Sequence, residues 1–180
     1  HVANTMPAPY YRFDGVDDVI TVANNADFKP TQAISIVASI YPTDFGTGVE
    51  VVHNMTWATD GWTFRITSAG AFALVYIDPG VGVWQTAGSG HNVSLNKHSQ
   101  IAITFDSATG TGVGYLNGKA AASTSTSTVF PDGSSAALKI GDDLNYDNFK
   151  GQISDVKIYN KVLTATEVKE LYSGASVPFK

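Results

Sequence analysis

The 180-residue chain contains no cysteine, so it forms no disulfide bond and no thiolate metal site. It also lacks any run of about 18 apolar residues, and we therefore expect no membrane span. Basic residues are few: 11 lysines and arginines lie scattered along the chain, and the net charge is −5. Because a nucleic-acid partner requires clustered cations, the composition argues against this class of partner.

What the chain does contain is a regular alternation of apolar and polar residues, which predicts β-strands. Short turn signals such as Asn117-Gly118 separate these runs at intervals of about eight to twelve residues. We therefore expect an all-β fold, a two-sheet antiparallel jelly-roll sandwich, with residues 1–180 as a single domain. The predicted strands include residues 19–22, 34–40, 62–66, 72–77, 100–105, 113–116, 138–140 and 153–159.

One short C-terminal helix is predicted to pack on this β domain. Thr164 and Glu167 have the spacing of a capping box, in which both side chains accept hydrogen bonds from backbone N–H groups. Val168 and Leu171 then fall on one face of the helix. Gly174 stands where the C-cap of such a helix is expected.

Several segments together resemble a known family. They occur in the order FDGVDDVITV, ISIVASIYP, GWTFRI, HSQIAITFD, VGYLNGK, LKIGDD and FKGQISDVKIYNKVLTATEVKELY, and they extend from about residue 10 to residue 171. In this order they resemble the laminin-G-like, concanavalin A-like jelly-roll superfamily in its bacterial or phage form. The resemblance implies two curved antiparallel sheets that recognise glycans or protein surfaces, and it leaves the ligand open.

The number of glutamates bears on catalysis. Hydrolases on the fold that this chain resembles carry the motif Glu-x-Asp-x-x-Glu on one strand, and glycoside hydrolysis needs two carboxylates across a cleft. This chain has only three glutamates, of which Glu167 and Glu170 lie in the predicted helix. Glu50 has no carboxylate two or five residues further on. We therefore expect that the protein is not an enzyme.

The segment FDGVDD, residues 13–18, places three carboxylates beside a glycine. Calcium takes six to eight oxygen ligands, which such a segment can supply. The resemblance implies a structural calcium near the pairing of the first and last strands, with Asp14 and Asp155 converging on it. The alternative is an acidic turn at Asp14-Gly15, solvated by Asp17 and Asp18. Both interpretations stay open, whereas a catalytic role lacks a partner acid or base.

A second polar cluster follows the predicted strand 138–140 and is the first candidate for ligand binding. It comprises Asp142, Asp143, Asn145, Tyr146 and Asp147. Carboxylates and amides bind sugar hydroxyls, and the ring of Tyr146 can stack on the apolar C–H face of a sugar. Loops on a rigid scaffold often carry recognition, which favours this interpretation over a merely solvated loop.

The three tryptophans divide by their surroundings in the sequence. Trp62 begins a predicted strand beside Gly61 and is expected in the core. Trp57 and Trp84 lie in or beside predicted loops, where each ring is a candidate ligand-binding platform or a buried core residue.

Taken together, these features predict a non-catalytic carbohydrate-binding or adhesion module. Its partner would be a glycan or surface polysaccharide held by the rim loops, its cofactor a structural calcium, and its location extracellular or on a virion surface. The alternative is a phage or cell-surface decoration domain that binds a capsid, tail or cell-surface protein.

Overall fold

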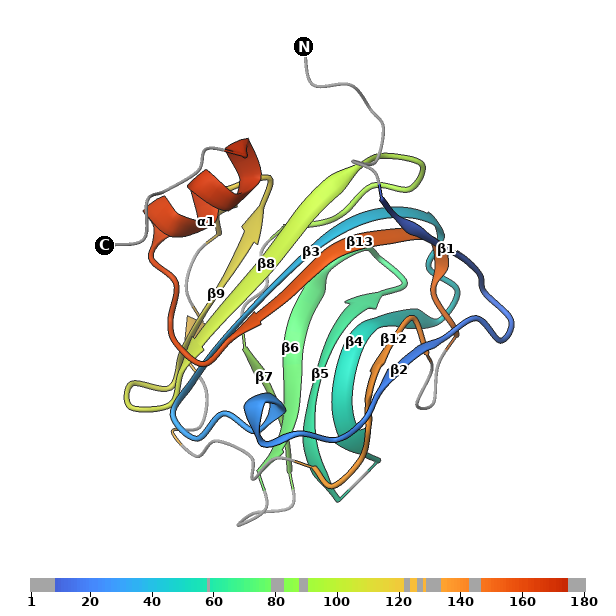
Figure 1. Cartoon of the computed structure of the whole chain (residues 1–180). Helices are drawn as coiled ribbons and strands as arrows, with labels where there is room; N and C mark the ends of the chain where they lie inside the picture. The colour runs from blue at the N-terminus through green and yellow to red at the C-terminus, as the bar shows by residue number, and fades with distance from the viewer. Residues whose placement is uncertain are drawn as a thin grey trace.

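The computed structural model describes most of the chain, and Figure 1 shows its course. The described residues are 9–57, 59–78, 83–87, 91–121, 124–125, 128, 134–142 and 147–174. No helix among them has the length and hydrophobicity needed to cross a membrane.

Within the described residues, thirteen strands form two antiparallel sheets, which confirms the predicted sandwich. Sheet A contains, in spatial order, β1 (Tyr11–Asp14), β13 (Lys150–Tyr159), β3 (Ala33–Asp44), β8 (Ser99–Asp106), β9 (Thr111–Leu116) and β10 (Lys119–Ala120), with β11 (Thr124–Ser125) also paired to β9. Sheet B contains β2 (Ile20–Val22), β12 (Leu138–Ile140), β4 (Gly48–Thr56), β5 (Asp60–Thr67), β6 (Phe72–Asp78) and β7 (Val83–Ala87). A 3₁₀ turn, η1 (Ala26–Phe28), connects β2 to β3.

The main core lies between the two sheets, because alternate residues of each strand point inward. Tyr76 of sheet B and Phe105 of sheet A meet there with their ring centroids 5.1 Å apart. Trp62 is 0% exposed, as predicted, and its Nε1 donates a hydrogen bond of 3.0 Å to the Phe28 carbonyl of η1. The side chains that fill this core from the longest strands include Ile34, Ile36, Ile40, Phe64, Ile66, Phe72, Leu74, Ile101 and Ile103.

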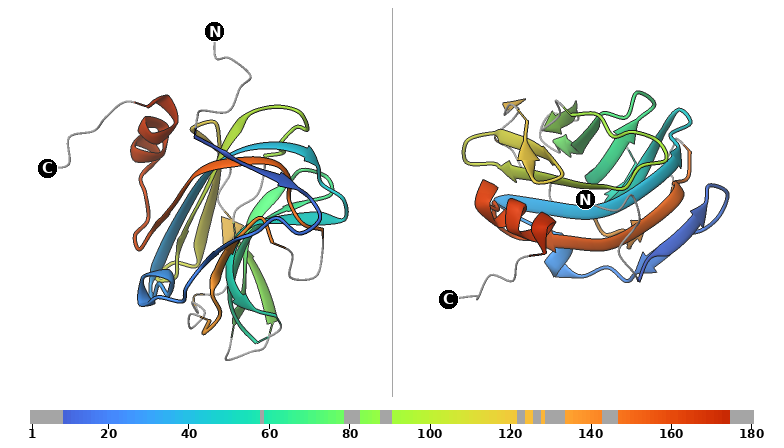
Figure 2. Two further views of the ribbon diagram at one scale, coloured as in Figure 1. Left: turned by 45° about the vertical axis from the view of Figure 1, so that its right-hand side comes forward. Right: turned by 90° about the horizontal axis from the view of Figure 1, so that it is seen from above.

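Helix α1 (Ala165–Ser173) packs on the outer face of sheet A and forms a third layer (Figure 2). Its buried Val168 joins Val37 of β3 and Ala102 of β8 in a second, smaller core. The predicted capping box is present: Thr164 Oγ1 accepts from the Glu167 N–H, and Glu167 Oε2 accepts from the Thr164 N–H.

The pKa of the Glu167 carboxylate in this capping box is unusually low. Hydrogen bonds from Lys161 Nζ and from Thr164 lower the pKa of Glu167 from its ordinary 4.5 to about 2, with the Lys161 bond the larger cause. The helix ends at Gly174, whose φ of 68° is the left-handed conformation that glycine adopts at helix C-termini.

Candidate functional site

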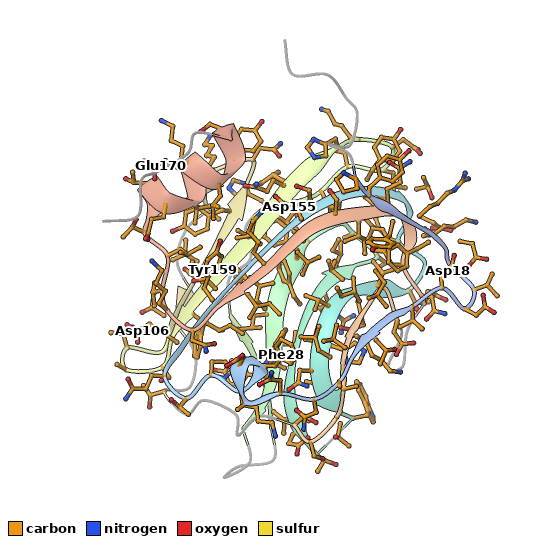
Figure 3. All side chains as sticks on the ribbon, in the orientation of Figure 1. Asp18, Phe28, Asp106, Asp155, Tyr159 and Glu170 are labelled. Carbon is orange, nitrogen blue, oxygen red and sulfur yellow. The ribbon has the colours of Figure 1, made fainter. Side chains whose placement is uncertain are left out.

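The expected convergence of Asp14 and Asp155 on one ion is not formed. Asp14 of β1 pairs with Lys150, whereas Asp155 lies five residues further along β13. At about 3.3 Å per residue this places the two aspartates roughly 16 Å apart along the strands, and Ca²⁺ ligands lie within about 2.6 Å of the ion. Figure 3 shows Asp155 well away from Asp18 of the β1–β2 turn. Asp155 instead forms an ion pair with Lys157 at a bulge of β13.

The segment 14–18 forms a turn that its own carboxylates hold together. The Val16 N–H donates to Asp14 Oδ1 at 2.7 Å, and the Asp14 N–H donates to Asp18 Oδ2 at 2.8 Å. Gly15 supplies the required positive φ of 82°. Asp14, Asp17 and Asp18 each bring a carboxylate oxygen within 4.8 Å of the others. The acidic turn is therefore present, and its outward oxygens fit the chemistry that calcium prefers.

Asp142, the first residue of the predicted ligand-binding loop, lies beside two residues of sheet B. Its Oδ2 is 2.6 Å from Lys139 Nζ and 3.5 Å from His53 Nε2, and its side chain is 18% exposed. Lys139 belongs to β12 and His53 to β4, and the two residues are paired across the strands. The structure thus connects the start of the predicted loop to the outer face of sheet B.

Asp147, at the other end of the same loop, has a structural role. Its Oδ2 accepts hydrogen bonds from the Thr47 N–H and from Thr47 Oγ1 at 2.8 Å, and these bonds lower the pKa of Asp147. Asp147 therefore holds the turn between β3 and β4. The loop residues Asp143, Asn145 and Tyr146 lie outside the described residues, so their predicted role stays a prediction.

The two tryptophans that the sequence left between a ligand-binding platform and the core lie in or next to sheet B. Trp57 follows β4, at the turn into β5, and is 39% exposed. Trp84 lies in β7, where the backbone pairs with that of Ile77 in β6; its side chain is outside the described part of the chain. The Trp57 ring is therefore partly accessible at the turn of the β4–β5 hairpin.

Sequence reasoning missed a row of polar residues on the outer face of sheet B. Val49, Val52 and Phe64 point into the core, whereas Glu50, His53, Thr63 and Arg65 beside them point outward. The register pairs Glu50 with Arg65 and His53 with both Thr63 and Lys139. We define the polar face of sheet B as Glu50, His53, Thr63, Arg65, Lys139 and Asp142.

The polar face is unusual because half of its residues are shielded from water. Glu50 is 1% exposed, and His53 and Thr63 are 2% exposed each, although all three lie on the side of the sheet opposite the core. The Arg65 guanidinium lies so close to Gly48 that a Cβ at this glycine would come within 2.8 Å of Nη2. Polar side chains usually stay in contact with water, so buried ones on the outer face of a sheet are a sign of function. Departures from the usual placing of polar and apolar residues concentrate at functional sites.

Comparison with known proteins agrees with this architecture. The family model described as the concanavalin A-like lectin/glucanases superfamily matches residues 14–169. No curated protein matches the sequence.

Solved structures share the fold at low sequence identity. Domain 4 of AbnA, an extracellular GH43 arabinanase from Geobacillus stearothermophilus solved with arabinotriose, has a TM-score of 0.74 at 19% identity, over 94% of this chain and 79% of that one. The CBM40 of the Ruminococcus gnavus IT-sialidase, solved with α2,3-sialyllactose, has a TM-score of 0.65 at 15% identity, over 87% and 97%. The botulinum neurotoxin serotype D binding domain has a TM-score of 0.72 at 18% identity, and the similarity covers 95% of this chain but 43% of that one.

Proposed function

Because the chain belongs to the concanavalin A-like lectin/glucanases superfamily, we propose that it is a non-catalytic module that binds a saccharide outside the cell. Two of its structural neighbours were solved with an oligosaccharide bound, arabinotriose in one and α2,3-sialyllactose in the other. At these identities the likeness shows the fold alone, so the saccharide-binding activity of this chain is our proposal and must be argued from its own residues.

The observation that carries the proposal is the polar face of sheet B. Its shielded groups lie beside Lys139 and Asp142, whose side chains are 38% and 18% exposed. These two residues therefore form the accessible edge of a polar network whose deeper members are fixed by the sheet. Such an arrangement holds hydrogen-bonding groups in place before a ligand arrives, which lowers the entropy lost on binding.

The groups at this edge match the chemistry of a sugar. Asp142 can accept hydrogen bonds from sugar hydroxyls, and the Lys139 ammonium can donate to them. Trp57, at the end of the β4–β5 hairpin, offers an exposed ring for the apolar face of a sugar. The predicted residues Asp143, Asn145 and Tyr146 follow Asp142 directly in the chain, and we propose that they extend the same site.

The proposed absence of catalysis follows from the distribution of glutamates. Glu167 and Glu170 lie in α1, which packs on sheet A rather than on the polar face. Glu50 is on the polar face, but it is paired across the strands with Arg65. No carboxylate stands two or five residues after Glu50, so the motif Glu-x-Asp-x-x-Glu of hydrolases on this fold is not formed around it.

We also propose a structural calcium at the Asp14–Asp18 turn. The three clustered carboxylates support it, and Asp17 is the informative residue, because the hydrogen bonds that hold the turn use Asp14 and Asp18. Asp17 can therefore be changed without breaking those two bonds. The ion would stabilise the pairing of β1 with β13 and would not take part in saccharide chemistry.

The function is tested by screening an array of saccharides and then titrating each bound saccharide by calorimetry. Asp142→Asn and Lys139→Ala should each weaken binding at least about tenfold, the equivalent of about 1.4 kcal/mol for a lost charge-assisted hydrogen bond. Asp155→Asn and Lys157→Ala are the matched controls, because they remove a similar ion pair from sheet A. If no saccharide binds and the protein instead binds a capsid, tail or cell-surface protein, the decoration alternative replaces this proposal.

A further inference from the structure

A pocket lies on the outer face of sheet A, on the opposite side of the sandwich from the polar face of sheet B. Its volume is about 340 Å³, which is in the range of small-molecule sites. Arg12 of β1, Gln152 of β13 and Tyr41 of β3 are cross-strand neighbours and form one row of its floor. Asp14, Thr43 and Lys150 line the pocket beside that row.

The side chains of this pocket are available for a ligand. Arg12 and Lys150 are both exposed, and neither forms an ion pair with any residue that the structure describes. Tyr41 is partly exposed, and α1, the layer that covers sheet A elsewhere, packs on other residues of this face. The pocket therefore presents an aromatic ring, two cations, a carboxamide and a carboxylate together.

We propose that this pocket is a second binding site and that its ligand is a neutral saccharide. The Tyr41 ring would stack on the apolar C–H face of one sugar unit. Arg12, Lys150 and the Gln152 amide would donate hydrogen bonds to sugar oxygens, and the Gln152 carbonyl and Asp14 would accept them from hydroxyls.

The charges around the pocket decide between classes of ligand. Two cations line it, but Asp14 also lines it, and the carboxylates of Asp17 and Asp18 lie within 4.8 Å of that of Asp14. The chain as a whole carries a net charge of −5. Without an ion at the Asp14–Asp18 turn an acidic sugar would meet these like charges, whereas a neutral sugar can use donors and acceptors of both signs with or without calcium at the turn. A purely apolar ligand would leave the charged groups desolvated and unpaired.

The position of the pocket has a functional consequence that rests on the proposed function. The polar face belongs to the outer side of sheet B, and the pocket lined by Tyr41 belongs to the outer side of sheet A. The two sites therefore face away from each other. One short oligosaccharide cannot occupy both. A protein with both sites would therefore connect two polysaccharide chains and gain avidity on a surface that displays many of them.

The pocket is tested by NMR titration of the ¹⁵N-labelled protein with neutral hexasaccharides of arabinose, xylose, glucose and mannose, and with tetragalacturonate as the acidic probe. We expect at least one neutral hexasaccharide to shift the backbone amides of Arg12, Tyr41 and Gln152. The result should be the same in an Asp142→Asn background, which removes a residue of the other site. The two backgrounds show whether a missing signal means that the pocket binds no saccharide or only that the polar face binds none.

Calorimetry of variants completes the test. Tyr41→Ala and Gln152→Ala should each weaken binding of that hexasaccharide at this site about tenfold or more, whereas Tyr11→Ala should leave it unchanged. Tyr11 is the matched control because it lies in β1, is 65% exposed and does not line the pocket. The proposal is overturned if no neutral hexasaccharide shifts these amides, if tetragalacturonate binds more tightly, or if Gln152→Ala and a correctly folded Tyr41→Ala bind like Tyr11→Ala.

Discussion

Trp62 and Trp57 lie on the same β4–β5 hairpin, yet their substitution should have opposite consequences. Trp62 is 0% exposed, packs between the sheets and donates through Nε1 to the carbonyl of Phe28. Trp57 is 39% exposed at the turn between the strands. Replacing each by alanine therefore separates a residue that holds the fold from one that we propose to contact the ligand.

The expected magnitudes follow from burial. Trp→Ala in a core costs about 3–5 kcal/mol, which is a large part of the roughly 5–15 kcal/mol that stabilises a typical domain. For a domain of this size each kcal/mol corresponds to about 2–4 °C, so Trp62→Ala should lower Tm by about 6–20 °C. Trp57→Ala should lower Tm clearly less than Trp62→Ala, because part of the Trp57 residue is already exposed to solvent in the folded protein.

Thermal denaturation followed by circular dichroism measures the first effect, and calorimetry with the saccharide measures the second. Trp62→Phe keeps most of the buried ring but removes the hydrogen bond to Phe28, so its Tm should lie between those of the wild type and Trp62→Ala. The reasoning is refuted if Trp57→Ala lowers Tm as much as Trp62→Ala, or if Trp57→Ala binds the saccharide normally.

Four further predictions concern the helix cap, the calcium and the rim loop. Thr164→Ala should cost about 1 kcal/mol in urea denaturation without changing ligand affinity. Because the pKa of Glu167 falls from 4.5 to about 2 on folding, its stabilisation is full above about pH 4.5 and is lost as the pH falls towards 2, so Glu167→Gln should flatten this part of a pH–stability curve. Excess EDTA should lower the Tm of the wild type but not of Asp17→Asn, and equal shifts in the two proteins would rule out calcium at this turn. Tyr146→Ala and Asp143→Ala should each weaken saccharide binding at least about tenfold at unchanged Tm, and normal binding by both would place the site elsewhere.

The strands that could be predicted from sequence are those in which large apolar residues alternate with small or polar ones. In β8, Ile101, Ile103 and Phe105 alternate with smaller or polar residues, and this period of two was sufficient. In β4 the same rule fails, because a bulge puts both Val51 and Val52 into the core. The strand then lacks a clear alternation, and its outward Glu50 and His53 could not be assigned to a shared face.

Sequence reasoning could predict only those features whose residues lie close together in the chain. The capping box was found because its two residues are three positions apart, and Asp142 was identified as one member of an acidic cluster. Its contact with His53 depends on the register between β12 and β4, which are far apart in sequence. The expected convergence of Asp14 with Asp155 failed for the same reason, since the register of β1 along β13 is not encoded in either motif.

The central claim is that the protein binds a saccharide at the polar face of sheet B. Its most direct test is a calorimetric titration of the tightest saccharide from the array into three proteins: the wild type, Asp142→Asn and Asp155→Asn. We expect Asp142→Asn to bind at least about tenfold more weakly and Asp155→Asn to bind like the wild type. Equal affinities for all three proteins would contradict the claim.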